Sequence, residues 1–201
     1  MGSTPSAHMI SGIVADRRRV LCSNAAPFTT DRRMTSPPDF EIDPRYFRNV
    51  LGHFPTGVVA ITSLDPDGNP VGMAVSSFTS VSLHPPLVAF LPGKSSDTFP
   101  VVRDAGRFCA NILSAEQQHV CQGMSMKGTE KFVGVSWTPA PSGMPRISQS
   151  VAWIDCEIQA IHDAGDHYIV VGRVTAMEID RADLPLIFFQ GGYGWFSPTA
   201  P

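Results

Sequence analysis

The chain has 201 residues, of which 43% are hydrophobic and 16% are charged, and its formal net charge is -3. This composition supplies enough apolar material for one compact domain and excludes wholesale disorder. Five of the 15 Lys and Arg residues lie within residues 1–33, so the remaining chain is acidic, which argues against a nucleic-acid-binding surface.

Two further classes of protein are disfavoured by local patterns. No stretch reaches the roughly 20 apolar residues of a membrane span, and no signal-peptide-like apolar run follows the start. None of the cysteines forms a C-x-x-C pair or has a histidine at zinc-ligand spacing. We therefore expect a reduced, cytoplasmic protein with no membrane contact and no metal; its cysteines are Cys22, Cys109, Cys121 and Cys156.

Residues 1–38 are rich in Ser, Thr, Pro, Ala and Arg and show no hydrophobic periodicity. We expect a flexible N-terminal leader here, followed by a single domain over residues 39–201. Met34 is an alternative start of the protein. A transit peptide would share the Arg- and Ser-rich composition, but the amphipathic pattern of such peptides is missing.

The first predicted element of the domain is an amphipathic helix. Asp43 suits the N-cap, Pro44 suits the first helical position, and Pro55 ends the segment. Apolar residues recur between them at helical spacing: Tyr46, Phe47, Val50, Leu51 and Phe54. Residues 57–63 predict a strand, and Asp67-Gly68 predicts a turn after it.

The central part of the chain alternates strands with short helices. Residues 71–83 predict one continuous strand, and residues 86–92 predict a fully apolar, buried strand. A polar loop then opens a short helix that ends at Asp104. Residues 107–114 predict a further strand, and Ser114 is expected to cap the helix of residues 115–126.

The C-terminal part contains the clearest hairpin of the sequence. Residues 127–150 are turn-rich and irregular, whereas residues 151–179 form two alternating strands around a turn at residues 163–166. Residues 185–196 end the chain with a strand and a glycine-rich turn. About seven strands without regular β-α-β alternation predict a mainly β protein, built as a closed or partly closed antiparallel barrel.

Several catalytic motifs are missing from the sequence: the dinucleotide fingerprint G-x-G-x-x-G, the Walker phosphate loop and the G-x-S-x-G nucleophile elbow. Residues 72–82 instead offer four serines and a threonine, either as partners for a planar ligand or as ordinary strand hydroxyls. Residues 92–98 place Lys94 and three hydroxyls before a helix, which suits either a phosphate or simple N-capping. His162 and His167 flank the hairpin turn, where surface histidines are commoner than a metal site.

Six segments in order resemble the flavin reductase-like family over residues 40–197. The family implies a split β-barrel FMN-binding fold with short flanking helices and a homodimer with flavin in a groove near its interface. It also implies an NAD(P)H:flavin oxidoreductase that reduces FMN or FAD by hydride transfer and supplies a partner monooxygenase. Reductases that serve aromatic or steroid-ring hydroxylases look most similar. The segments are residues 45–63, 72–88, 107–113, 131–135, 165–174 and 188–196.

The resemblance also implies roles for individual residues. The flavin ring or ribityl chain is expected to contact Gly72, Met73, Ala74, Ser76 and Ser77, and backbone groups to come from Leu91, Pro92 and Gly93. Ser96 and Thr98 are expected to bind phosphate, with Lys94 close by. His167 is the catalytic candidate, as a positioning and electrostatic group near the nicotinamide, and Tyr193 lies on the same side.

One segment departs from the family pattern. Many relatives have a basic residue after the helix of residues 115–122, where this chain reads Cys121-Gln122-Gly123-Met124. A contact to the flavin phosphate is therefore either missing or supplied elsewhere.

Two other functions stay open for a chain of this kind, because fold does not decide function. One is a non-catalytic flavin- or haem-binding module on the same barrel, and the other is an enzyme like pyridoxamine-phosphate oxidase. His167 and Tyr193 favour the reductase, because a protein that only stores flavin or haem needs no residues that contact a nicotinamide. The choices between FMN and FAD and between NADH and NADPH are also open.

Overall fold

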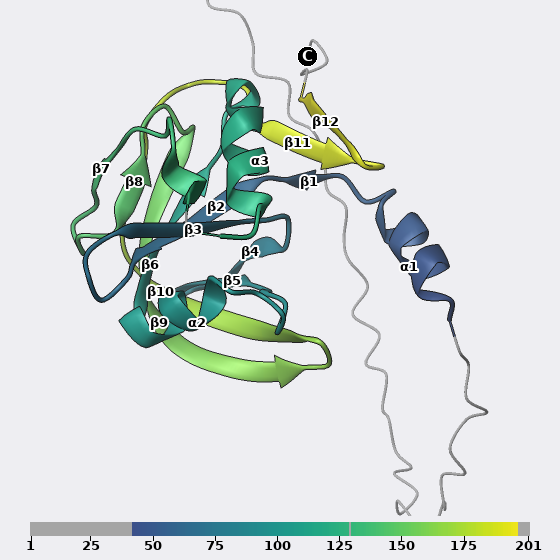
Figure 1. The fold of residues 1–201 in the computed structure, drawn as a ribbon, viewed down its shortest axis with the longest axis horizontal. Coiled ribbons are helices and arrows are strands. Elements are labelled where there is room, and N and C mark those ends of the chain that lie inside the picture. The colour runs from purple at the N-terminus through teal and green to yellow at the C-terminus, as the bar shows by residue number, and fades with distance from the viewer. Residues whose placement is uncertain (1–41, 129, 197–201) are drawn as a thin grey trace, which may run out of the picture. The chain divides into compact units, whose positions relative to one another are not determined.

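The computed structural model describes residues 42–128 and 130–196, which form one unit; the expected leader of residues 1–38 and Cys22 lie outside them. Seven strands form the main antiparallel sheet in the order β3-β2-β6-β9-β10-β5-β4 (Figure 1). The prediction of a mainly β fold is confirmed. The strands are β2 (Val59–Leu64), β3 (Pro70–Val75), β4 (Phe78–Leu83), β5 (Pro86–Phe90), β6 (Arg107–Ile112), β9 (Ala152–Ala164) and β10 (His167–Ile179).

The connection between β3 and β4 gives the sheet its barrel shape. These strands lie at the two opposite edges of the sheet, yet only Ser76 and Ser77 separate them in the chain. Since the three residue steps from Val75 to Phe78 span at most about 11 Å, the edges have to approach each other, and the sheet curls into a barrel. The sequence-based prediction of one continuous strand over residues 71–83 was wrong, because the chain bends at these two serines and changes edge.

The barrel interior is filled by aromatic and aliphatic side chains from the strands and from the helix α2 (Phe99–Ala105). Phe90 and Phe108 are fully buried, with ring centroids 5.1 Å apart. A second apolar cluster lies beneath α3 (Gln118–Ser125), which packs on β3. These two clusters hold α2 and α3 against the barrel.

Other elements differ from the predictions in extent. The first helix, α1 (Pro44–Leu51), ends before Pro55, because Gly52 caps it; Asp43 is its N-cap, as predicted. The helix predicted after Ser114 begins as a 3₁₀ turn, η1 (Ala115–Gln117), and continues as α3. The segment expected to be irregular contains three short elements: η2 (Glu130–Phe132), β7 (Trp137–Pro139) and β8 (Pro145–Ile147).

The C-terminal segment is a hairpin rather than a single strand. β11 (Leu186–Phe189) and β12 (Gly192–Trp195) pair with each other, and the two-residue β1 (Thr56–Gly57) pairs with β11. Gln190 and Gly191 both have positive φ, as a tight primed turn requires. Gln190 also donates its N–H to the Gly52 carbonyl at 2.9 Å, so this hairpin contacts the end of α1.

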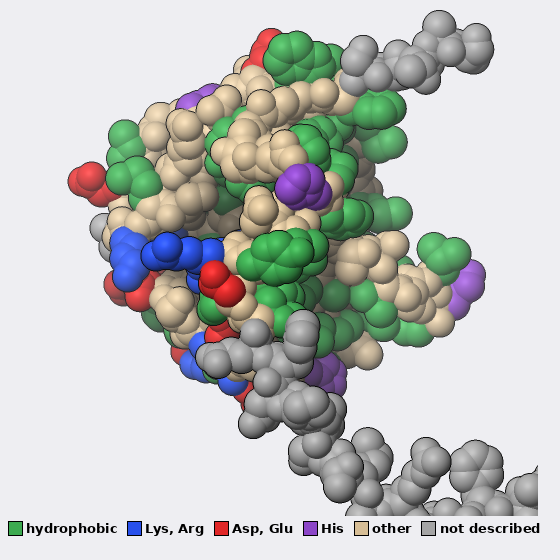
Figure 2. Space-filling model, turned by 90° about the vertical axis from the view of Figure 1, so that its right-hand side faces the viewer, with side chains coloured by type: hydrophobic (Ala, Val, Ile, Leu, Met, Phe, Trp, Pro, Cys, Tyr) green, Lys and Arg blue, Asp and Glu red, His purple; other side chains and the backbone are tan. Residues whose placement is uncertain are grey.

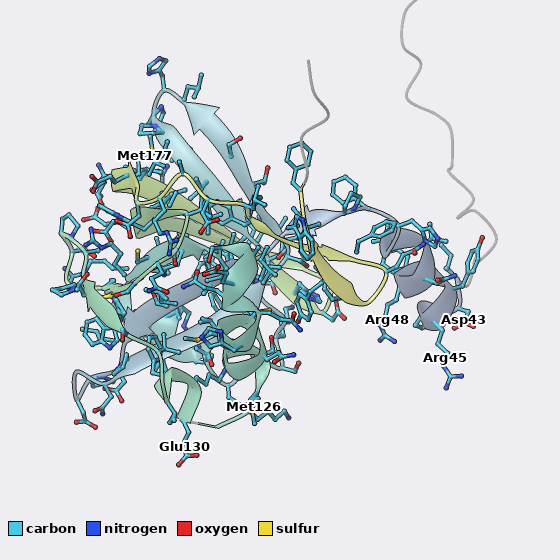
Figure 3. The ribbon with its side chains drawn as sticks, turned by 90° about the horizontal axis from the view of Figure 1, so that it is seen from above. Asp43, Arg45, Arg48, Met126, Glu130 and Met177 are labelled. Carbon is cyan, nitrogen blue, oxygen red and sulfur yellow. The ribbon has the colours of Figure 1, made fainter. Side chains whose placement is uncertain are left out.

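The helix α1 buries none of its residues, although its side chains are mostly apolar (Figure 3). Phe47 and Leu51 are 51% and 56% exposed. Figure 2 looks onto the side that carries α1 and β12 in Figure 1, and hydrophobic side chains spread over much of this face. Among the described residues no helix is long and apolar enough to cross a membrane.

Candidate functional site

The loop after β5 meets the start of β10. The two strands are antiparallel neighbours in the sheet, so the end of one lies beside the beginning of the other. The backbone N–H of Lys94 donates to the Asp166 carbonyl, and that of Tyr168 donates to the Pro92 carbonyl, each at 2.9 Å. Gly93 and His167 form an isolated β-bridge between these two hydrogen bonds. The sheet therefore brings together two segments that the sequence separates by more than 70 residues.

His167 lies directly against the backbone of this loop. A Cβ atom added to Gly93 would be 3.6 Å from Nε2 of His167. On the other side of the ring, Nδ1 lies 2.7 Å from Oδ1 of Asp166. The hydrogen bond to His167, together with the charge of its ring, lowers the pKa of Asp166 below the usual range of an aspartate. This carboxylate fixes the orientation of the imidazole and leaves Nε2 on the side of Gly93.

The two histidines of the hairpin occupy different positions along its strands. His162 pairs with Ile169 across the hairpin, and His167 pairs with Ala164. No group of three or more metal-ligating side chains occurs in residues 42–128 and 130–196. A metal is thus not implied by the geometry of this hairpin.

Lys94 turns away from the hydroxyls that follow it. Its Nζ atom lies 2.6 Å from Oδ1 of Asp163 and 5.2 Å from the ring centroid of Tyr168. The hydrogen bond to Asp163 raises the pKa of Lys94 above that of an ordinary lysine. The structure thus directs the Lys94 side chain to the β9–β10 hairpin and gives it no contact with Ser96 or Thr98.

The lysine that lies beside these hydroxyls is Lys131 instead of Lys94. Its Nζ atom donates to Oγ1 of Thr98 at 2.9 Å and to the Met124 carbonyl at 3.3 Å. Burial lowers the pKa of Lys131 relative to an exposed lysine. The sequence analysis gave this lysine no role, and the one signal for it was its position at the start of a family-like segment, residues 131–135.

A cavity of about 250 Å³ lies beside this lysine. Ser96 lines it, but its Oγ also accepts the N–H of Phe99 at 3.2 Å, so the hydroxyl caps α2 as well. The helix α2 begins only after Thr98 and has seven residues, so the hydroxyls and lysines rather than a helix dipole dominate the cavity. The remaining lining residues are Met73, Ala74, Ser95, Asp97, Met124, Ser125, Met126, Lys127 and Lys131.

Only some residues of the segment 72–77 line this cavity. Met73 and Ala74 line the cavity, whereas Gly72 lies behind it, where a Cβ atom would come within 2.5 Å of the Met124 sulfur. Ser77 accepts the Leu91 N–H at 3.1 Å and donates to the Leu91 carbonyl at 3.2 Å. Ser76 is exposed at the bend between the strands. Gly72 and Ser77 therefore have structural roles besides any contact with a ligand.

Tyr193 contacts Cys121 of α3 and Phe188 rather than His167. Its hydroxyl is 3.4 Å from Sγ of Cys121, and its ring centroid is 5.3 Å from that of Phe188. The hydrogen bond with Cys121, burial and the charge of the thiolate form raise the pKa of Tyr193 to about 12. The two residues expected at the nicotinamide, His167 and Tyr193, thus have different neighbours within this chain.

The site as a whole suits an anionic ligand with a flat, hydrogen-bonding group. Lys131, Ser96 and Thr98 offer a cation and hydroxyls at one place, as a phosphate requires. The backbone at Gly93 lies against the His167 ring, with which it forms a β-bridge. No side-chain pair of the general acid–base type is needed for such binding.

Comparison with known proteins agrees with this interpretation. The family model described as flavin reductase like domain matches residues 51–197. A flavin reductase from Pseudomonas putida is 51% identical over 156 residues, which cover 78% of this chain and 92% of that protein. The reductase subunit HsaB of a flavin-dependent monooxygenase from Rhodococcus jostii is 45% identical over 157 residues, covering 78% of this chain and 80% of that protein.

A solved structure shares the fold. It is the NADH:FAD oxidoreductase SgcE6 of Streptomyces globisporus, in complex with NAD and FAD fragments. The TM-score is 0.74 at 32% sequence identity, and the match covers 80% of this chain and 99% of the other. The expected split-barrel architecture is confirmed by this likeness.

Proposed function

Because the chain belongs to the flavin reductase-like family, we propose that it is an NAD(P)H:flavin oxidoreductase that supplies reduced flavin to a monooxygenase. One structural observation carries this proposal. The loop of residues 92–94 meets His167 at the barrel edge, beside a cavity that holds Ser96 and Lys131. A purely structural barrel would not need a cation and hydroxyls at a cavity on one side of this loop and an oriented imidazole against its Gly93.

The residues present fit the phosphate end of a flavin. Lys131 is a half-buried cation within hydrogen-bond distance of Thr98, and both lie beside Ser96 and the cavity. Charge-assisted hydrogen bonds to a phosphate from such a set are each worth about 1.5–3 kcal/mol. We assign phosphate binding to these three residues, so that Lys131 supplies the contact that the segment of residues 121–124 lacks.

The chain's residues position the reactants rather than react themselves. Bound flavin and reduced nicotinamide together supply the hydride transfer. Met73, Ala74 and the backbone of residues 91–93 orient the flavin ring, and the Gly93 N–H stabilises the charge of its reduced form. His167, held by Asp166, orients the nicotinamide through Nε2. The reduced flavin has to leave for the partner, so moderate affinity suits this site.

A homodimer completes the proposal. An isolated eight-residue helix is marginally stable in water, yet α1 buries no residue and exposes an apolar face. A second copy of the chain that covers α1 and the adjoining β11–β12 hairpin would bury this face. Tyr193 belongs to this hairpin, so in such a dimer it would lie close to the interface.

The proposal also includes the part of the chain that carries the activity and the cellular compartment. Residues 39–201 carry the activity, and a variant that starts at Met34 keeps both its melting temperature and its turnover. The described cysteines Cys109, Cys121 and Cys156 are free thiols, which supports a reducing compartment such as the cytoplasm.

The test is steady-state NADH and NADPH oxidation by the purified protein with riboflavin, FMN and FAD added in turn. We expect nicotinamide oxidation that depends on added flavin. Flavin or haem binding without this turnover would establish the non-catalytic alternative. Oxidation of pyridoxamine phosphate without a monooxygenase would establish the other enzyme class.

A further inference from the structure

Three methionines line the cavity of about 250 Å³ beside Ser96 and Lys131, which we call the phosphate cavity. Met73 and Met124 are buried, so their sulfur atoms are shielded from solvent. Met126, which follows directly after α3, is 66% exposed. Of the methionines that line the phosphate cavity, Met126 is therefore the one that a small reagent in solution can reach.

The end of α3 fixes the position of Met126. Its backbone N–H donates to the Gly123 carbonyl at 3.2 Å, and the chain leaves the helix at this residue in an extended conformation. The Met126 side chain lies on the same side of the molecule as Glu130 of η2 and away from Met177 (Figure 3). The thioether is thus held at the phosphate cavity while it stays open to solvent.

The Lys131 ammonium offers three N–H donors to this cavity. It donates to Oγ1 of Thr98 at 2.9 Å and to the Met124 carbonyl at 3.3 Å, and we assign the third N–H to the flavin phosphate. Because Met126 lines the same cavity, an oxygen atom added to its sulfur would compete with the phosphate for this donor.

A thioether gains such an oxygen when a peroxide oxidises it. The O–O bond of hydrogen peroxide breaks and an S–O bond forms, the sulfur loses two electrons, and the second peroxide oxygen leaves as water. Reduced flavin that meets dioxygen instead of a monooxygenase gives it two electrons, which with two protons yields hydrogen peroxide and oxidised flavin. The resulting methionine sulfoxide is polar, and its oxygen accepts hydrogen bonds.

We propose that Met126 is a site of sulfoxide formation, at which hydrogen peroxide from unused reduced flavin lowers the affinity of this chain for phosphate-bearing flavins. The inference rests on the proposed function, which supplies the reduced flavin and places its phosphate beside Lys131. The modification slows further flavin reduction when no monooxygenase accepts the product, and so limits the release of peroxide.

The experiment treats the purified full chain with hydrogen peroxide, removes the excess with catalase, and locates sulfoxides by peptide mass spectrometry. Fluorescence titration measures the Kd of FMN and of riboflavin before and after treatment. Met126→Leu removes the sulfur and keeps an apolar side chain of similar volume. Met177→Leu is the matched control, because Met177 is 69% exposed on β10 and lies away from Met126 (Figure 3).

We expect peroxide to add one oxygen to Met126 and to Met177 and to leave Met73 and Met124 largely unmodified, because access to solvent decides the rate. In the parent and in Met177→Leu, the treatment should weaken FMN about tenfold, since a hydrogen bond to a charged group is weakened. Riboflavin has no phosphate and should change by less than about twofold. Met126→Leu should keep the FMN affinity that it had before treatment.

Two further measurements test the reversibility and the origin of the modification. Methionine sulfoxide reductases should restore the FMN affinity of the treated parent. Turnover of NADH and FMN in air without a monooxygenase should produce the same sulfoxide at Met126, and added catalase should prevent it.

The proposal would be overturned by a Met126 that resists peroxide, or by an FMN affinity that stays unchanged once Met126 is fully converted to sulfoxide. An equal loss in Met126→Leu, an equal weakening of riboflavin, or turnover in air without the sulfoxide would also overturn it. Added peroxide acts without any reductase activity, so these outcomes reject only the modification site. A parent that oxidises neither nicotinamide with any flavin rejects the proposed function itself.

Discussion

Nζ of Lys131 lies 2.9 Å from Oγ1 of Thr98, although 33 residues separate them in the chain. The contact joins η2 to the start of α2 and closes one side of the cavity below Met73 and Ala74. Lys94, which is much nearer to Thr98 in sequence, instead pairs with Asp163 at 2.6 Å. The cation available to a phosphate at Ser96 and Thr98 is therefore Lys131.

Replacing this cation should weaken phosphate-bearing flavins selectively. For Lys131→Gln we expect FMN affinity to fall about ten- to a hundredfold, because a hydrogen bond to a charged group is lost. Ser96→Ala combined with Thr98→Ala should act in the same direction. Fluorescence titration with FMN and with riboflavin measures both effects.

Riboflavin is the control for these variants, because it has no phosphate and should bind each variant as it binds the parent. Lys94→Gln is the matched lysine control and should leave FMN affinity unchanged. If riboflavin weakened as much as FMN, the three residues would have only structural roles.

His167→Ala should act on the nicotinamide step rather than on flavin binding. We expect a higher KM for NADH or a slower flavin reduction, by about ten- to a hundredfold, because stacking of the two rings remains. Stopped-flow reduction at several NADH concentrations measures this effect, and flavin Kd should stay the same. Asp166→Asn should cause a smaller loss of the same kind, since Asp166 only orients the ring.

His162→Ala is the control from the same hairpin, and we expect parental kinetics for it. An unchanged reduction rate for His167→Ala at every NADH concentration would contradict the assignment. Tyr193 would then be the next candidate for the nicotinamide side.

Gly72→Ala should lower stability. The added Cβ would lie 2.5 Å from the sulfur of Met124 and 3.3 Å from Phe132, and Met124 is 1% exposed, so its sulfur could move only by displacing packed neighbours. Overpacking of this kind costs about 1–3 kcal/mol in the free energy of unfolding, measured by urea titration. Gly57→Ala is the control, because nothing lies within 4 Å of its Cβ position. A Gly72→Ala protein as stable as the parent would show that α3 shifts freely on β3.

Removing the apolar face of α1 should dissociate the proposed homodimer. Phe47→Ser combined with Leu51→Ser takes away two half-exposed side chains of this face. We expect sedimentation velocity to report dimers for the parent and monomers for the variant, with lower flavin affinity in the monomer. Met177→Ser, on a strand far from α1, should stay dimeric (Figure 3). A monomeric parent protein would rule out the dimer.

We expect the phenol of Tyr193 to lose its proton at a higher pH than an ordinary tyrosine does. Its pKa is raised to about 12 by the hydrogen bond with Cys121 and by burial, against 10.0 for the unperturbed group. The folded protein then holds this proton at pH values where the unfolded chain has lost it. The contribution of the protonated phenol to the stability of the folded protein is present below pH 10 and is lost progressively as the pH rises toward 12.

Ultraviolet absorbance of tyrosinate at high pH measures this titration. Tyr193→Phe should remove the late component, and Cys121→Ala should shift it to lower pH. A parent in which all tyrosines titrate together near pH 10 would contradict the contact between Tyr193 and Cys121.

The local elements of this fold are readable in the sequence. Asp43 and Pro44 mark the start of α1, and the alternating pattern around Gly165 marks the β9–β10 hairpin, because caps and tight turns involve only neighbouring residues. The family resemblance, present in ordered short segments, also indicates the split barrel and the flavin chemistry from the sequence alone.

The contacts between distant segments were not readable in this way. The bend at Ser76 and Ser77, the pairing of Lys94 with Asp163, and the arrival of Lys131 at Thr98 all depend on which strands become neighbours in the sheet. Strand order is decided by how the whole hydrophobic core packs, and no local pattern encodes it. The sequence by itself therefore determined the family and those elements that depend on neighbouring residues, whereas the tertiary structure decided that Lys131, and not Lys94, lies beside Thr98.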